Sequence, residues 1–448
     1  MATKSSIVAY ESDYGSTSSY NNTNQIEPEY SEAINIYGAD LASNSWGIES
    51  IPSNCPKFGD YTIVSELLDK FVTGSVVSKR FPIVWANGNE RSDVTGCTHE
   101  YNTTLPKASS KNVIGVGAIN SNDKSMTTFS SWGPVDDGRL KPDVVAPGCT
   151  DDQGTLTPID DIGITSTIID NQYGSMCGTS MSAPHVSGIM ALMLQQFQCL
   201  RPHNIETPLP STLKAILMHT AKDLNNTGPD YTSGYGLVNA TLAIDYIIYR
   251  YFREENLSSS SETDTFNFTI NDSSKPIKVT LVWDDPAGAP FASKELVNDL
   301  DLYLKAPNGT IFRSWTLDPN NPSSPATKNG NTRDNIEQVY VENPGDDNLY
   351  TNGEWQIIVN ATSCPQCTQK YSLVYKRPWE INLFEGWNFI SLPIVPYDRS
   401  FSTTVDNNVS AIFYYNGTAE EWMGWYRDEQ SNDITKWDIG KGYWVDTD

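Results

Sequence analysis

A serine stands at the start of a long apolar segment, in a setting that could make it a nucleophile. Ser180 follows Gly178 and precedes the apolar run that begins at Ile189. A glycine turn can place such a residue at the N-terminus of a helix, where free backbone N–H groups and the helix dipole favour negative charge. Attack by a serine hydroxyl on a carbonyl group creates negative charge on the carbonyl oxygen, so this position suits nucleophilic catalysis. An isolated serine here would be interpreted more simply as a helix N-cap.

The residues around Ser180 favour the nucleophile. Residues 178–188 read GTSMSAPHVSG. This segment resembles the nucleophile motif of the subtilisin-like serine peptidases, the subtilases. The resemblance implies that Ser180 forms an acyl-enzyme with a protein or peptide substrate.

Further segments resemble the same family, in its order and spacing, over about residues 39–243. Residues 85–90 (WANGNE) are similar to the segment that supplies the side-chain donor of the oxyanion hole. This implies that role for Asn89 and a substrate-binding role for Gly88. Residues 43–47 (SNSWG) resemble the extended segment that pairs with the substrate backbone and walls the pocket for the P1 side chain. Ser45, Trp46 and Gly47 are therefore expected to bind substrate.

The rest of a catalytic triad is missing from the sequence. A subtilase needs an aspartate and a histidine in a His-Gly-Thr setting upstream of the oxyanion asparagine, yet no histidine precedes Asn89. His185 lies five residues after Ser180, about 140° around a helix at ~100° per residue, so it cannot face the nucleophile. We interpret His219 as a structural residue, and His99 and His203 as loop residues.

Two interpretations follow from the missing histidine. In the first, Met1 is an internal start and the chain is part of a longer precursor that carries the missing N-terminal catalytic segment. The chain alone is then expected not to hydrolyse peptides at rates typical of the family. In the second, the protein is catalytically inactive and serves as an extracellular binding or adhesion protein. A His-Gly-Thr segment encoded just upstream would favour the first, and polysaccharide binding without any reaction of Ser180 would favour the second.

The pattern of apolar residues predicts an α/β fold with a parallel sheet over residues 1–250. Short apolar runs at 39–42, 82–86, 112–117 and 143–146 are typical of buried strands. Helical spacing of apolar residues predicts one helix between 63 and 76, with Asp60 as N-cap, and another near 213–220, with Ser211 as N-cap. We predict that residues 1–250 form a subtilisin-like domain without its upstream Asp/His segment.

Two further modules are expected after a polar linker at residues 253–261. Apolar residues alternate with polar ones at 277–283 and 355–359, which predicts a jelly-roll-like β-sandwich over residues 262–377. Residues 378–448 hold six of the twelve tryptophans. We predict a small Trp-rich β module there, with the tryptophans either in its core or in a surface row that binds sugar.

Acidic residues of the predicted sandwich suggest a structural calcium ion. Asp299 and Asp301 are two apart in a strand-like run, so their side chains leave the same face. Four further oxygen-bearing side chains could converge with them: Asp284, Asp285, Asn335 and Glu337. Ligation by oxygen alone suits Ca²⁺ rather than zinc. The alternative is a solvated acidic edge.

The composition limits the partners that the chain can bind. It holds 30 Lys and Arg against 55 Asp and Glu, a net charge of −25, which argues against binding to nucleic acid or to an anionic membrane. With 38% hydrophobic residues the chain can build a core. No run approaches the ~20 apolar residues of a membrane span.

Cysteine and asparagine usage favours an extracellular or cell-surface location. Cys364 and Cys367 are expected to form a hairpin disulfide, because they lie in a strand-rich region. By resemblance, Cys149 and Cys177 lie in segments that meet near the active site, where they would form either a disulfide or two buried thiols. Eleven N-x-S/T sequons support the same location.

Overall fold

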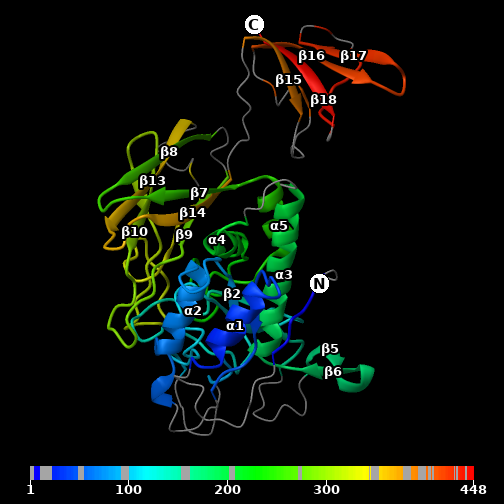
Figure 1. Ribbon diagram of the computed structural model, residues 1–448. Helices are drawn as coiled ribbons and strands as arrows, with labels where there is room; N and C mark the ends of the chain where they lie inside the picture. The colour runs from blue at the N-terminus through cyan, green and yellow to red at the C-terminus, as the bar shows by residue number, and fades with distance from the viewer. Residues whose placement is uncertain are drawn as a thin grey trace.

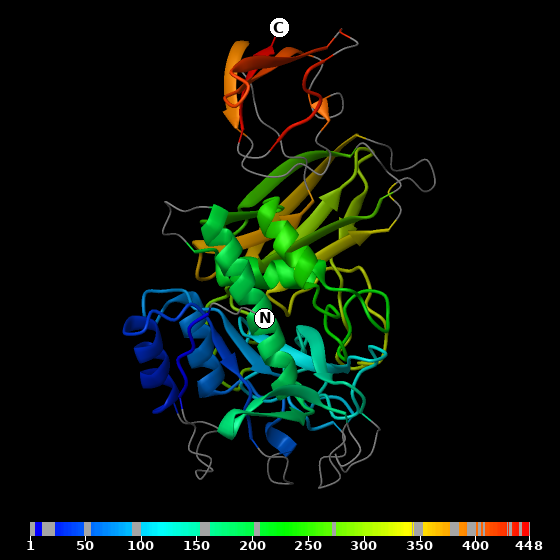
Figure 2. The ribbon, with the colours of Figure 1, turned by 90° about the vertical axis from the view of Figure 1, so that its right-hand side faces the viewer.

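The computed structural model of the chain describes most of its 448 residues. These are residues 5–10, 23–48, 55–91, 100–152, 162–200, 207–270, 275–342, 344, 353–376, 385–391, 400–401, 405, 408–427, 429, 432–438 and 441–447. An α/β domain, a pair of antiparallel sheets and a C-terminal sheet follow one another along the molecule (Figures 1 and 2).

The α/β domain is built on a four-stranded parallel sheet in the order β1-β2-β3-β4. Its strands are β1 (Ala42–Asn44), β2 (Ile83–Ala86), β3 (Ile114–Asn120) and β4 (Val144–Cys149). Every residue of β2 and β3 is buried, because helices cover both faces of the sheet. Alternate residues enter two separate cores: Val84 packs with α3 and α4, and Trp85 packs with α2.

Helices flank this sheet. They are α1 (Ile26–Asn35), α2 (Ile63–Thr73), α3 (Thr179–Leu200), α4 (Pro210–Thr220) and α5 (Ala240–Ile248), with 3-10 turns η1 (Cys55–Lys57) and η2 (Ile169–Asn171). A hairpin of β5 (Ile164–Ile168) and β6 (Gln172–Met176) leads into α3. The residues described here contain no helix long and apolar enough to cross a membrane.

Two expected helix caps are wrong. The N-cap of α2 is Thr62 rather than Asp60: Thr62 and Ser65 form a reciprocal capping box, with each backbone N–H bonded to the other's hydroxyl. Helix α4 begins at Pro210, a residue that needs no N–H partner at this position. The Ser211 hydroxyl instead lies 3.3 Å from Asp284 Oδ2 and 2.9 Å from the Ser372 hydroxyl.

Two four-stranded antiparallel sheets follow, in the orders β11-β10-β13-β8 and β12-β9-β14-β7. Their strands are β7 (Phe252–Leu257), β8 (Thr263–Ile270), β9 (Ile277–Trp283), β10 (Asp299–Lys305), β11 (Ile311–Arg313), β12 (Ile336–Val341), β13 (Gly353–Ser363) and β14 (Gln369–Tyr375). Side chains from both sheets share one core.

The expected linker at 253–261 is therefore wrong in its first half. Strand β7 pairs with β14, with Phe252 and Leu257 buried at its two ends and the four polar residues between them partly or largely exposed. Helix α4 packs against β9 and β14, so the outer face of this sheet is joined to the α/β domain through a common apolar core (Figure 1).

The C-terminal sheet has the order β15-β18-β16-β17. Its strands are β15 (Gly386–Ser391), β16 (Val409–Asn416), β17 (Glu421–Tyr426) and β18 (Gly442–Thr447). Trp425 and Trp437 lie in a small core on one face, whereas Trp387, Trp422 and Trp444 are exposed. Trp379 lies outside the described residues.

Candidate active site

Ser180 is the second residue of α3, at the helix N-terminus that the sequence predicts. The turn before it is held by Gly178, whose backbone N–H donates to the carbonyl of Gly148, 2.9 Å away. The φ angle of Gly178 is +152°, a conformation that favours glycine. The side chain of Ser180 is thus placed by a turn anchored to the end of β4.

The predicted substrate segment meets the predicted nucleophile. Ser180 Oγ donates to the carbonyl oxygen of Ser45, 3.2 Å away, and Ser45 Oγ donates to the carbonyl oxygen of Ser180 at 2.9 Å. These residues are 135 positions apart in the sequence. Because Ser45 directly follows β1, the ends of β1 and β4 converge at Ser180.

Asn89 is oriented by Thr179, the residue before the serine. Asn89 Oδ1 accepts hydrogen bonds from the backbone N–H and the hydroxyl of Thr179, at 2.8 and 3.0 Å. With the oxygen end held, the amide nitrogen turns toward Gly178. A Cβ atom added at Gly178 would lie 3.5 Å from Asn89 Nδ2 and 3.6 Å from the backbone nitrogen of Ser180. Two N–H donors therefore border one small space beside the serine.

Gly88 is held against the same threonine. Its backbone N–H donates to Thr179 Oγ1 at 3.3 Å. Its φ angle is +121°, and a Cβ atom there would lie 2.6 Å from Ser131 Oγ, so a larger residue would displace the chain. This close packing leaves no room for a side chain at the residue before Asn89.

Trp46 and Gly47 form one wall beside the serine. The Trp46 carbonyl accepts a hydrogen bond from Trp85 Nε1 at 2.8 Å, and the two rings lie 5.1 Å apart. Leu105 packs so closely on Gly47 and Gly88 that a Cβ atom at either position would meet its side chain. The two predicted substrate segments thus border a common space, with Leu105 between them.

Thr179 and Leu105 are site residues that sequence reasoning missed. Thr179 belongs to the nucleophile motif, so the motif could have drawn attention to it. Leu105 is an isolated apolar residue in the polar segment 101–110 (YNTTLPKASS), and only the folded chain shows that it separates Gly47 from Gly88.

Neither histidine within the described ranges contacts Ser180 Oγ. The ring of His185 bonds to the carbonyl of Met181, 2.8 Å away, one turn back on α3. The two ring nitrogens of His219 bond to Thr280 and Tyr246, and burial holds the pKa of His219 well below its usual value. Both therefore have structural roles, as expected. His99 and His203 lie outside the described residues.

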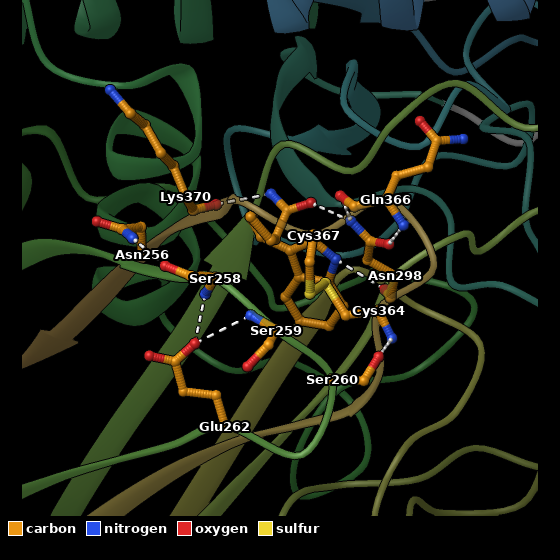
Figure 3. Close-up of a disulfide and its surroundings, with 12 residues drawn as sticks. Asn256, Ser258, Ser259, Ser260, Glu262, Asn298, Cys364, Gln366, Cys367 and Lys370 are labelled. Atoms are coloured by element: carbon orange, nitrogen blue, oxygen red, sulfur yellow. Dashed lines mark hydrogen bonds between the residues drawn. A yellow bond between two sulfur atoms is a disulfide. The ribbon is translucent and has the colours of Figure 1, made fainter.

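Both predicted disulfides are present. Cys149 at the end of β4 is joined to Cys177, with a Cα–Cα distance of 4.6 Å, so the bond ties the sheet to the turn that carries Ser180. Cys364 and Cys367 are joined in the loop between β13 and β14. Figure 3 shows this loop beside Asn298, which bonds to the backbone of Gln366. Cys199 is a free, exposed cysteine.

Comparison with known proteins gives the family. The family model described as "Subtilase family" matches residues 1–236, more than half of the chain. The chain belongs to the subtilase family. This confirms the resemblance that the motifs around Ser180 and Asn89 predict, and it makes a serine peptidase the function to test first.

Curated relatives match this subtilase chain only in part. A serine protease/ABC transporter B family protein, tagA, of Dictyostelium discoideum is 33% identical over 200 residues, 40% of the chain and 11% of the relative. A C5a peptidase of Streptococcus pyogenes serotype M6 is 32% identical over 182 residues, 37% of the chain and 14% of the relative. A thermophilic serine proteinase of Bacillus sp. AK1 is 35% identical over 144 residues, 32% of the chain and 28% of the relative. The matched region thus spans less than a third of each of these relatives.

The candidate calcium ligands fall into two groups that differ in their partners. Asp284 lies 3.3 Å from Arg80, and Asp285 forms a buried ion pair with Lys111, so a calcium ion there would have to displace a cation. Asn335 bonds to Asn112 and to the Trp283 carbonyl rather than toward the acidic strand. Among the residues with described positions, no three His, Cys, Asp or Glu side chains are gathered closely enough to hold a metal.

The second group lies around β10. Asp299 is 3.3 Å from Lys294, but its Oδ1 is buried without a hydrogen-bond partner. Asp301 accepts from the Thr362 hydroxyl, and its charge helps to raise the pKa of Glu337, after burial itself. The oxygen-only donors of this group suit Ca²⁺, and the site stays a prediction centred on Asp299 and Asp301.

Proposed function

We propose that this chain carries the nucleophile and the oxyanion hole of a subtilisin-like serine endopeptidase. The observation that carries the proposal is the pair of donors beside Ser180: its own backbone N–H and the Asn89 side chain border the space next to Gly178. Donors fixed in this way stabilise the charge that develops on a carbonyl oxygen under attack.

The reaction follows from these positions. A base takes the proton of Ser180 Oγ, which attacks the peptide carbonyl, and Asn89 Nδ2 and the Ser180 N–H hold the oxyanion. Collapse of the intermediate releases the amine and leaves an acyl group on Ser180, which water then removes. The backbone of Ser45, Trp46 and Gly47 would hold the substrate as an added strand.

Neither His185 nor His219 is the base in this proposal, since each has another partner. We propose that an N-terminal segment of a longer precursor supplies the histidine and aspartate, and that the 448-residue chain alone is inactive. The experiment compares peptide hydrolysis by the protein from its complete gene, its Ser180→Ala variant and this chain alone. Hydrolysis only by the first supports the proposal, whereas undiminished hydrolysis by the Ser180→Ala variant would contradict it.

A catalytically inactive extracellular binding protein is the second candidate, and the C-terminal sheet favours it. Trp387, Phe413, Trp422 and Trp444 line a hollow of about 400 Å³. Aromatic faces of this kind can stack on apolar faces of sugar rings. Retention of the chain on an insoluble polysaccharide, lost on replacing Trp387 and Trp422 by Ala, would support this role. Binding to polysaccharide would exclude the peptidase function only if Ser180 also proved inert in the protein from the complete gene.

We also propose that the protein acts outside the cell or at its surface and binds one structural calcium ion. The disulfides Cys149–Cys177 and Cys364–Cys367 support an oxidising location. The calcium test is thermal melting of the full chain in calcium and in chelator, repeated with Asp299→Ala/Asp301→Ala. A calcium-dependent rise in Tm that the double variant lacks supports the site, and an equal response in both proteins would remove it.

A further inference from the structure

Lys107 carries a positive charge in the protein interior, beside the proposed substrate segment. Its side chain is only 1% exposed. Its Nζ atom lies 4.6 Å from the centre of the ring of Trp46, a residue of the proposed substrate segment. Burial lowers the pKa of Lys107 to about 8, and no carboxylate contributes to that shift.

The other buried lysines with described positions all have acidic partners. Lys111 pairs with Asp285, whereas Lys141 and Lys214 share Asp143. A buried ammonium group without a carboxylate is costly, because desolvation is not offset by an opposite charge. Contact with the face of a tryptophan ring offsets only a part of this cost. The stability of the fold therefore does not explain why the ammonium group of Lys107 is buried.

The chain around Lys107 runs along both predicted substrate segments. Leu105, two residues earlier, packs on Gly47 and on Gly88. Its backbone N–H donates to the carbonyl of Asn87, 2.9 Å away. The side chain of Leu105 thus fills the space between the two glycines, and Lys107 follows two residues later.

We propose that Lys107 forms the positively charged end of the P1 pocket and selects peptides with an acidic side chain at P1. This inference rests on the proposed peptidase function and names its substrate class. The methylene groups of a P1 glutamate would lie against Leu105 and Trp46, and its carboxylate would supply the opposite charge that Lys107 lacks. The net charge of −25 does not attract such substrates, so the selection would come from this local charge.

The experiment measures binding, because binding does not need the missing base. Three fluorescein-labelled tetrapeptide amides, alike except for glutamate, glutamine or leucine at P1, are titrated with the 448-residue chain by fluorescence anisotropy. We expect the glutamate peptide to bind about 10- to 100-fold more tightly than the glutamine peptide, the range for a hydrogen bond to a charged group. Lys107→Met should bring this ratio close to one, and Lys107→Arg should keep most of it.

Thermal melting shows that the variants are folded. Lys107→Met should melt at or above the temperature of the parent chain, since it removes an unpaired buried charge. Lys124→Met, which removes the same charge from an exposed turn, should leave the binding ratio unchanged. Equal binding of the glutamate and glutamine peptides, or a ratio that survives Lys107→Met, would overturn the role of Lys107 and leave the peptidase proposal standing. Failure of the folded chain to bind any of the peptides would contradict both.

Discussion

At the scale of single residues, the site depends on one side chain that does not react. Thr179 holds the Asn89 carbonyl oxygen through both its backbone N–H and its hydroxyl. The same hydroxyl accepts from Gly88 N–H. Thr179 therefore sets the direction in which the Asn89 amide nitrogen points, and it would position this donor before substrate arrives, as electrostatic stabilisation requires.

Replacement of Asn89 tests its role as a donor. In the active protein we expect Asn89→Ala to lower kcat by about 10²- to 10³-fold, the usual effect of losing one oxyanion donor. Asn89→Asp keeps an oxygen that can accept from Thr179 but replaces the Nδ2 donor with a carboxylate oxygen that repels the oxyanion, so it should lose at least as much activity with little change in Tm. Activity close to that of the parent enzyme in Asn89→Asp would show that Nδ2 does not hold the oxyanion.

The sequence points to the residues that we propose to react more readily than to the residues that support them. Ser180 and Asn89 stand in motifs whose order is informative, and the structure brings both to one space. Lys111 and Asp285 are 174 positions apart, so nothing local in the sequence shows that one lysine has a carboxylate partner and that Lys107 has none. Pairing of charges depends on tertiary contacts between distant segments.

At the scale of elements, the turn into α3 is fixed from both sides. Gly178 bonds to Gly148, and Cys177 is joined to Cys149. Strands β2, β3 and β4 were predictable because buried strands give continuous apolar runs. The strand expected at 39–42 instead lies at Ala42–Asn44, and only its last residue is buried. The start of β7 was not predictable, since its polar residues resemble a linker in the sequence and form a strand only by pairing with β14.

Loss of the Cys149–Cys177 disulfide should destabilise the protein. The bond closes a loop with a sequence separation of 28, for which the chain-entropy model gives about 3.6 kcal/mol. Cys149→Ala/Cys177→Ala should therefore show a lower free energy of unfolding in urea. Cys199→Ala, at an exposed free cysteine, is the matched control and should change little. Equal stability of the two variants would argue that the bond does not form in solution.

At the scale of the whole molecule, the α/β domain and the paired sheets share a buried polar junction. Lys111 Nζ donates to Asp285 and to the carbonyls of Pro286 and Glu295. Asn112 exchanges hydrogen bonds with the backbone of Asp285 in both directions. Because these groups come from both units and are buried, we expect the two units to unfold together.

Removal of one partner of the buried pair tests this coupling. Lys111→Met leaves Asp285 with an uncompensated charge in the interior, which typically costs about 3–5 kcal/mol. Lys111→Met/Asp285→Asn should recover a substantial part of that loss, since the unpaired charge is gone. Denaturant unfolding followed by near-UV circular dichroism would measure both. If Lys111→Met alone were as stable as the parent chain, the junction would not hold the units together.

The same junction should make stability depend on pH. Burial raises the pKa of the Glu295 carboxyl from 4.5 to about 7. The folded state then keeps a proton that the unfolded state releases, so this contribution to stability is complete below about 4.5 and is lost as pH rises through about 7. Asp136, in the same small cavity, has its pKa raised in the same direction, also to about 7, first by burial.

Neutralising Glu295 should weaken that dependence. We expect the parent chain to melt at a lower temperature at pH 8 than at pH 5.5, and Glu295→Gln to show a smaller difference between the two. Glu354→Gln, at an exposed residue of β13, is the control and should keep the parent's difference. A difference that Glu295→Gln leaves unchanged would mean that Glu295 does not hold a proton in the folded state at neutral pH.

The most direct test of the central claim is covalent labelling of Ser180. A fluorophosphonate probe reacts with a serine that a base activates, and mass spectrometry identifies the labelled residue. In the protein from its complete gene, we predict a single label on Ser180 that Ser180→Ala abolishes, and no label on the 448-residue chain alone. Absence of any label on Ser180 in the complete protein, with the protein folded, would contradict the assignment of Ser180 as the nucleophile.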